Sequence, residues 1–179
     1  MSQLFVDSIQ PKTSGGVVSG VGKILQVKSA AFTDVQAISS ADTRTDITNL
    51  SVSITPSSTS SKILVNTHIS YGGTAVNLYG SGNLLRDSTP IGVNTTATGN
   101  QLNISFGLNL VGQANETFKL RNSSMTFLDS PSSTSALTYK VQGRVDANGT
   151  LYINRPGEDS NADYGSRGIS TITVMEVSA

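Results

Sequence analysis

The sequence lacks several residue types on which protein chemistry often depends. Its 179 residues include no cysteine, no tryptophan and one histidine, and only 13% of them are charged, about half the ~25% usual in soluble domains. Without cysteine the chain forms no disulfide, thiol nucleophile or cysteine-ligated zinc site. No apolar run reaches the ~18 residues that a membrane span needs, and the first residues lack the basic and apolar parts of a signal peptide. We therefore expect no membrane insertion.

The charge balance argues against a nucleic-acid-binding protein, and the apolar content indicates a folded domain. Twelve basic and twelve acidic residues give a formal net charge of zero, so we expect no electrostatic footprint for nucleic acid. Serine and threonine are abundant, with 27 and 20 residues, and Leu, Ile, Val and Phe together make up about a quarter of the chain. This apolar share lies above the ~20% below which disorder is the default. The chain can therefore build one core of moderate size.

Alternating apolar and polar residues predict β-structure throughout the chain after residue 22. The period of two is clearest at residues 50–55, 62–71 and 136–145. We expect further strands at residues 23–28, 76–86, 101–110, 117–128, 150–154 and 168–178. Turn residues separate these segments, mostly at the ~8–12-residue spacing of a sandwich or barrel. The fold class expected is all-β, an antiparallel β-sandwich of the jelly-roll type with a short extended N-terminal segment.

Two pairs of turn residues carry local predictions. Asn148 and Gly149 stand between two strand-like segments, and this pair predicts a type I′ β-hairpin. Gly72 and Gly73 follow the segment 62–71 and predict a turn at its end.

The first 22 residues differ from the rest and form a separate segment ahead of a domain at residues 23–179. Leu4, Phe5, Val6 and Ile9 make one short apolar patch. Leaving such side chains in water forgoes roughly 1.5–3 kcal/mol each. Residues 1–22 are therefore expected either to dock on a partner or a neighbouring copy, or to form a first strand that folds back onto their own domain.

Candidate catalytic and metal-binding residues are few. His68, the single histidine, lies in the middle of an expected strand, which favours a structural role over that of a general base. Asp159, Asn161 and Asp163 have the spacing that begins a calcium loop, but the glycine and glutamate that complete such a loop are missing. We therefore predict no enzymatic activity, no metal site and no cofactor. The three glutamates are little material for the paired carboxylates of a glycan hydrolase.

Longer stretches of the sequence resemble the virion structural proteins of marine tailed phages, of the tail-fibre or appendage type found in cyanophages. The resemblance covers roughly residues 23–179 in order, and residues 1–16 are similar to the starts of fibre-like proteins from the same phages. It is carried by residues 51–65 (SVSITPSSTSSKILV), 85–92 (LRDSTPIG), 127–144 (FLDSPSSTSALTYKVQGR), 152–155 (YINR) and 169–177 (ISTITVMEV).

This resemblance implies a component of the virion, assembled in the host cytoplasm, with no enzymatic role and with a homotrimeric β-sandwich head. On this interpretation the chain is a short fibre or appendage, anchored to other virion proteins through Leu4, Phe5, Val6 and Ile9. A capsid decoration or cement protein that clamps neighbouring capsomers is the alternative, because it also needs an N-terminal arm and a compact β-domain.

Two further sets of residues are expected to make contacts. The trimer interface is predicted on the last strand, at Ile169, Thr171, Thr173, Met175 and Val177. A host-surface glycan is expected to meet loops 72–75, 94–100 and 156–167, near which Tyr71, Tyr79 and Tyr164 could stack on sugar rings.

Overall fold

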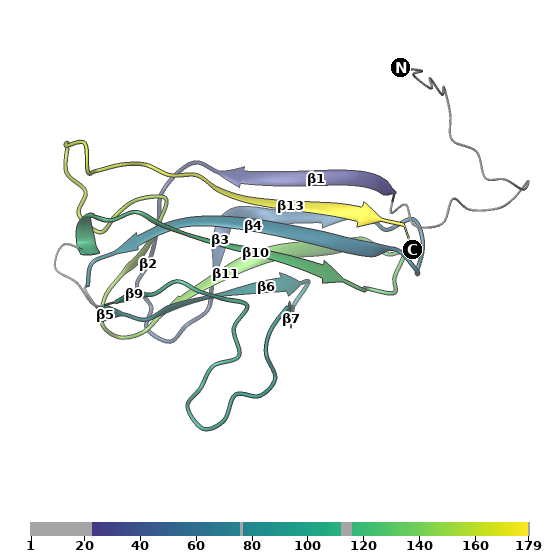
Figure 1. Cartoon of the computed structure of the whole chain (residues 1–179), viewed down its shortest axis with the longest axis horizontal. Helices are drawn as coiled ribbons and strands as arrows, with labels where there is room; N and C mark the ends of the chain where they lie inside the picture. The colour runs from purple at the N-terminus through teal and green to yellow at the C-terminus, as the bar shows by residue number, and fades with distance from the viewer. Residues whose placement is uncertain (1–22, 76, 112–115, 179) are drawn as a thin grey trace, which may run out of the picture.

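A computed structural model describes residues 23–75, 77–111 and 116–178, and within these ranges the chain is a sandwich of antiparallel β-sheets (Figure 1). The segment 1–22 and its four predicted anchoring residues lie outside the described residues. The described strands confirm the all-β prediction. A single turn of 3-10 helix, η1 (Glu116–Phe118), is the one helical element of the described part.

The first sheet is built around β4, the longest strand. β13 pairs with one edge of β4 and β10 with the other, and β1 lies outside β13, giving the order β1-β13-β4-β10. Two short strands add to the sheet at the end of β4, where β12 pairs with the last three residues of β4 and β2 pairs with β12. The bounds of these six strands are β1 (Ile24–Phe32), β2 (Gln36–Ile38), β4 (Lys62–Gly73), β10 (Arg121–Asp129), β12 (Leu151–Ile153) and β13 (Ser170–Val177).

The second sheet packs against the first and has the order β3-β11-β6-β7, with β8 also paired to β6. A separate pair, β5 with β9, closes one end of the sandwich. The bounds of these strands are β3 (Thr45–Ile54), β5 (Asn77–Leu78), β6 (Gly80–Arg86), β7 (Thr89–Ile91), β8 (Phe106–Gly107), β9 (Leu110–Val111) and β11 (Leu137–Val145).

The connections between the two sheets make this sandwich a jelly roll. From β1 the chain crosses to β3, returns to β4, crosses to β6 and β7, returns to β10, crosses to β11 and returns to β13. Two facing four-stranded layers, β1-β13-β4-β10 and β3-β11-β6-β7, connected by such alternating crossings define a jelly roll. The predicted topology is therefore confirmed.

The core is formed by the inward residues of both sheets, as the period of two dictates. β11 and β13 alternate strictly between buried and half-buried positions. Each large aliphatic side chain buried in this way contributes roughly 1.5–3 kcal/mol. The largest fully buried side chains are Tyr139, Ile38, Leu50, Ile54, Ile63, Ile69, Leu78, Leu84, Leu108, Leu110, Leu151 and Ile153.

An ion pair connects the two sheets through the interior. Arg86 of β6 donates from Nη1 to both carboxylate oxygens of Asp129 on β10, at 2.9 and 2.8 Å. The buried Tyr139 donates its hydroxyl to the same carboxylate at 2.7 Å. Burial, together with this bond to Asp129, raises the pKa of Tyr139, so its hydroxyl stays protonated. These three groups satisfy one another where a lone charge would be costly.

Two local predictions are wrong. Asn148 and Gly149 do not form a hairpin, because β11 pairs with β3 and β6 whereas β12 pairs with β2 and β4. The residues between β11 and β12 instead cross from one sheet to the other. Gly72 and Gly73 are the last residues of β4 rather than a turn. A Cβ on Gly72 would lie 2.5 Å from Cα of Pro156, so glycine here allows close packing of the next loop.

Candidate functional site

The chain enters and leaves the described domain at the same end, called the proximal end below. The backbone N–H of Ser178 donates to the carbonyl of Lys23 at 2.9 Å, which ties the exit of β13 to the entry of β1. The loop 156–168 and η1 lie at the opposite, distal end (Figure 1). The distal loops are therefore separated from the point of entry by the length of the sandwich.

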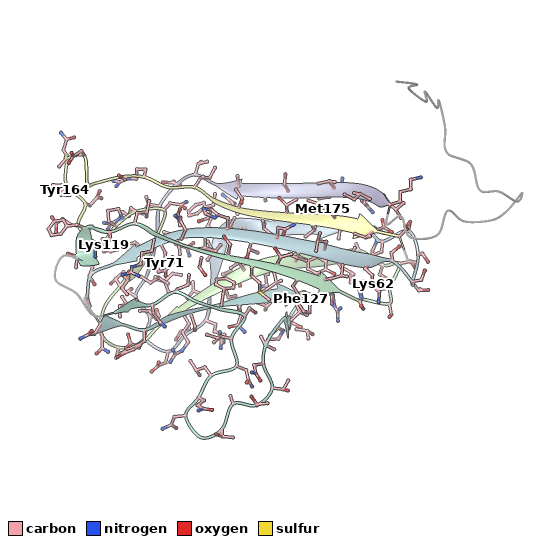
Figure 2. All side chains as sticks on the ribbon, viewed as in Figure 1. Lys62, Tyr71, Lys119, Phe127, Tyr164 and Met175 are labelled. Atoms are coloured by element: carbon pink, nitrogen blue, oxygen red, sulfur yellow. The ribbon has the colours of Figure 1, made fainter. Side chains whose placement is uncertain are left out.

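The solvent side of the β1-β13-β4-β10 sheet carries one row of apolar side chains near the proximal end. Val27 lies opposite Met175 across the β1–β13 pair, and Met175 lies opposite Leu64 on β4. Leu64 in turn lies opposite Leu128 on β10. The inner two are half-buried, whereas Val27 and Leu128 are 52% and 51% exposed. We call these four residues the apolar row; Met175, in its middle, is labelled in Figure 2.

Hydroxyl and amide groups follow the apolar row toward the distal end of the same sheet. Thr126 of β10 donates to the side-chain oxygen of Asn66 on β4 at 2.7 Å. Farther along, Nδ1 of His68 lies 3.2 Å from the hydroxyl of Ser124. His68 therefore faces outward within a row of small polar groups.

The apolar row and these polar rows together are called the neutral face. Among its outward residues in the described strands there is no carboxylate, and Lys62 at its proximal rim donates to Ser130 at 2.8 Å. The acidic residues of these strands, Asp129 and Glu176, point into the sandwich instead and are buried.

The predicted trimer-interface residues all lie on the solvent side of the molecule. Four of them occupy the half-buried outward positions of β13, in the middle of the neutral face, and Ile169 is exposed just before the strand. The structure thus places Thr171, Thr173, Met175 and Val177 in line along the outward side of β13, with Ile169 just ahead of the strand. Their role between copies stays a prediction.

An exposed aromatic pair marks the distal end. Tyr164, in the loop 156–168, meets Phe118 of η1 edge to face, with ring centroids 5.2 Å apart. The two rings are 48% and 37% exposed, and Tyr164 projects at the end of the molecule (Figure 2). The backbone N–H of Glu158 donates to the carbonyl of Thr117 at 2.7 Å and holds the loop against η1.

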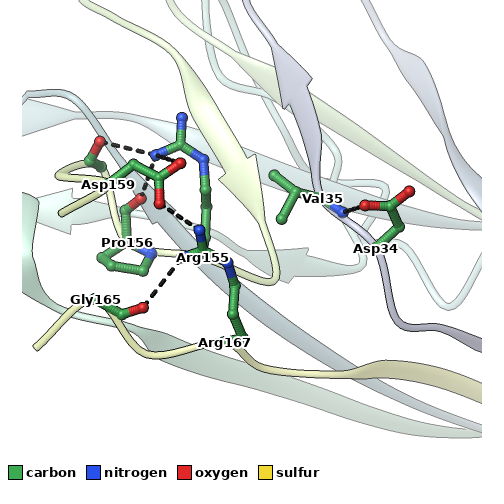
Figure 3. Close-up of polar contacts among 8 residues, drawn as sticks. Asp34, Val35, Arg155, Pro156, Asp159, Gly165 and Arg167 are labelled. Carbon is green, nitrogen blue, oxygen red and sulfur yellow. Dashed lines mark hydrogen bonds and ion pairs between the residues drawn. The ribbon is translucent and has the colours of Figure 1, made fainter. Parts of the chain in front are cut away.

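Two arginines shape the loop that carries Tyr164 (Figure 3). Arg155 donates to the carbonyls of Pro156 and Gly157 at 3.0 and 3.1 Å, and its guanidinium stacks 3.4 Å from the ring centroid of Tyr152. Arg167 pairs with Asp159 and donates to Gly165, next to Tyr164.

The residues with calcium-like spacing, Asp159, Asn161 and Asp163, belong to this loop, which is held by the contacts of the two arginines. The hydrogen bond from Arg167 lowers the pKa of Asp159, so this carboxylate stays ionised and paired. Its partner is thus an arginine of the same loop. Across the described ranges, no group of three or more acidic or histidine side chains is arranged to hold a metal ion. The described residues also contain no helix that is long and apolar enough to cross a membrane.

The three tyrosines predicted to meet a host surface are placed differently. Tyr71 is only 6% exposed and belongs to the core, so the prediction that it stacks on a sugar is wrong. It sits at an inward position of β4, where the period of two turns its ring into the sandwich. Tyr79 and Tyr164 are about half exposed and remain available to a ligand.

Several residues of these surfaces were missed from the sequence. Val27, Leu64 and Leu128 extend the predicted β13 surface across three other strands, and Phe118 is the partner of Tyr164. The alternation in residues 62–71 already predicts that Leu64 points outward, away from the core. Which residues of β1 and β10 align with it depends on strand register, for which the local sequence carries no signal.

Solved virus structures are similar to this chain at low sequence identity. The structure of infectious bursal disease virus, Gx strain, matches with a TM-score of 0.41 and 12% identity over 97% of this chain and 44% of the other. The crystal structure of the infectious bursal disease virus VP2 subviral particle matches with a TM-score of 0.38 and 11% identity over 97% and 43%. The chain therefore spans less than half the length of these proteins. No family model and no curated protein matches the sequence.

Proposed function

We propose that this protein is a non-enzymatic structural component of a phage virion, a short fibre or appendage whose jelly roll projects from the particle. The observation that carries the proposal is the separation of the two ends of the domain. The chain enters β1 at the proximal end, whereas the exposed Phe118–Tyr164 pair lies on distal loops. An attached protein that meets a second surface needs this arrangement.

The proximal end is assigned to attachment. Residues 1–22 lead directly into β1, and their patch of Leu4, Phe5, Val6 and Ile9 suits apolar docking or strand addition on another virion protein. The resemblance of residues 1–16 to the starts of phage fibre-like proteins supports the same assignment. The protein would thus reside in the virion after assembly in the host cytoplasm.

The distal end is assigned to the host surface. Exposed aromatic rings recognise sugars by stacking on their apolar faces, and the loop that carries Tyr164 is held by Arg167, which pairs with Asp159 and donates to the carbonyl of Gly165. A cell-surface glycan is therefore the class of ligand proposed. Tyr79, which is also exposed, is a second candidate contact for it.

Deletion of residues 1–16 tests the attachment role. Particles assembled with the truncated protein should lack it, as measured by mass spectrometry of purified virions, while circular dichroism of the isolated protein remains that of a folded β-sandwich. Tyr164→Ala is the matched control: it should leave incorporation unchanged and reduce adsorption to cells. Full incorporation of the truncated protein would contradict the proposed anchor.

Cryo-EM of the intact particle tests the appendage against the alternative. The proposal expects density for this protein on the tail or at vertices, with loops 156–168 pointing away from the particle. Density at every capsomer junction would instead identify a capsid decoration protein.

A further inference from the structure

We propose that the neutral face is the surface through which copies of this chain associate, with the apolar row at the centre of the contact. The row is continuous across four strands, a width of about 15 Å for three strand spacings of ~4.8 Å. Ile24 at 54% exposure and the half-buried Val177 lie beside it at the proximal end. The result is a stripe of side chains that the isolated domain leaves in water.

Folding of the domain does not require this stripe to be apolar. The core is complete on the inward side of the same strands, where Ile63, Val65 and Val174 are fully buried. Single exposed apolar residues are common, but a contiguous set marks a contact surface. Burial of this set against a partner would remove apolar surface from water, which favours association.

The charge of the neutral face favours a second copy as the occupant. Its outward residues in the described strands include no carboxylate, and Lys62 lies at the rim, engaged with Ser130. A strongly basic partner would find no opposite charge to pair with here, and an acidic partner would find only Lys62, at the rim, among the outward residues of the described strands. A second neutral face, in contrast, offers apolar surface and hydroxyl groups of the same kind and meets this one without like-charge repulsion.

The free edge of β1 points to the same occupant. β1 pairs with β13 along one edge and with no described strand along the other. Ile24, Leu25 and Val27 are exposed along it, and an uncovered apolar edge strand invites pairing with another chain. In a closed ring, Leu128 at the far end of the row would meet this edge of the next copy. The homotrimer predicted from the sequence is such a ring.

Light scattering on the purified full-length protein tests this inference without any particle. The unsubstituted chain should have about three times the monomer mass of 18.6 kDa. Leu128→Glu and Val27→Glu should each lower the mass to that of a monomer, because they place a carboxylate inside the neutral contact. Both positions are about half exposed, so circular dichroism and the unfolding midpoint of the monomer should remain those of a folded domain.

A matched substitution on the second sheet is the control. Ser51→Glu places the same charge on an exposed outward position of β3 and should leave the mass of the assembly unchanged. A monomeric unsubstituted chain at millimolar concentration would overturn the inference, as would an assembly that survives both Leu128→Glu and Val27→Glu. Neither result would contradict the proposed role in the virion, because that role is tested separately by incorporation into particles.

Discussion

The two outer faces of the sandwich have the same backbone architecture and opposite surface chemistry. On the β3-β11-β6 side, Lys140 donates to Asp46 at 2.8 Å and Arg144 pairs with Asp42. Gln142 adds a third bond, to the other oxygen of Asp46, at 2.7 Å. The neutral face on the other sheet has no such pairs. One face thus carries ion pairs formed within the chain, and the other carries no carboxylate and only Lys62, at its rim, among its described outward residues.

Folding does not explain this difference. Both sheets supply the same kind of inward side chain to one common core, so the outward positions are free to vary. The charged face suits lasting contact with water, because its groups are solvated or paired. The centre of the neutral face suits contact with another protein surface, since burying it leaves Lys62 at the rim and takes no carboxylate out of water.

The largest difference in stability is expected between a charge in the interior and a charge on the outer face. Asp129→Ala leaves the partly buried guanidinium of Arg86 and the buried hydroxyl of Tyr139 without their partner, which costs about 1–3 kcal/mol. Asp46→Ala removes an exposed partner of Lys140 and should cost no more than ~1 kcal/mol. Urea unfolding of the two variants measures both costs. Equal losses would show that the two sites do not differ in the way described.

The stability of the domain should depend on acid through Glu176, the buried carboxylate of β13. Burial raises the pKa of Glu176, but hydrogen bonds from Ser57 and Gln26 outweigh this effect and lower the pKa to about 2. The carboxylate has a lower pKa in the folded than in the unfolded chain, so its stabilisation is present above about pH 4.5 and is lost as the pH falls toward 2.

Glu176→Gln is the variant that isolates this acid dependence. Urea midpoints measured between pH 4.5 and pH 2.5 should fall less steeply for the variant than for the unsubstituted protein. The same slope in both proteins would assign the acid sensitivity to other groups.

The smallest expected effect on stability separates folding from association. Leu128→Ala removes an exposed side chain and should change the unfolding free energy of the monomer by less than ~0.5 kcal/mol, while it weakens association of the copies. Thr138→Ala on the charged face should also have a small effect on the unfolding free energy, but it should leave the association of the copies unchanged. Analytical ultracentrifugation measures the association. A large stability loss with Leu128→Ala would mean that this residue serves the fold rather than the contact.

Sequence alternation predicted which side chains point inward, and it did so because burial of one face imposes the period of two on each strand. It therefore identified the core positions of β11 and the inward positions of residues 62–71 in β4. It did not identify the apolar row, because the alignment of Leu64 with Leu128 depends on the register of strands that are distant in sequence.

Local signals failed where tertiary contacts decide the outcome. Asn148 and Gly149 favour a hairpin, yet the flanking strands belong to different sheets. Asp129 stands next to Ser130 and Pro131, residues typical of a turn, yet it forms the ion pair with Arg86 between the two sheets. The partner of Tyr164, Phe118, belongs to a different part of the chain, and no motif connects the two.

A structure of the purified assembly, determined by cryo-EM or crystallography, tests the contrast between the two faces most directly. The account predicts that Val27 and Leu128 are buried between copies while the Lys140–Asp46 pair remains in water. An assembly in which the charged face is buried and the apolar row stays exposed would contradict it.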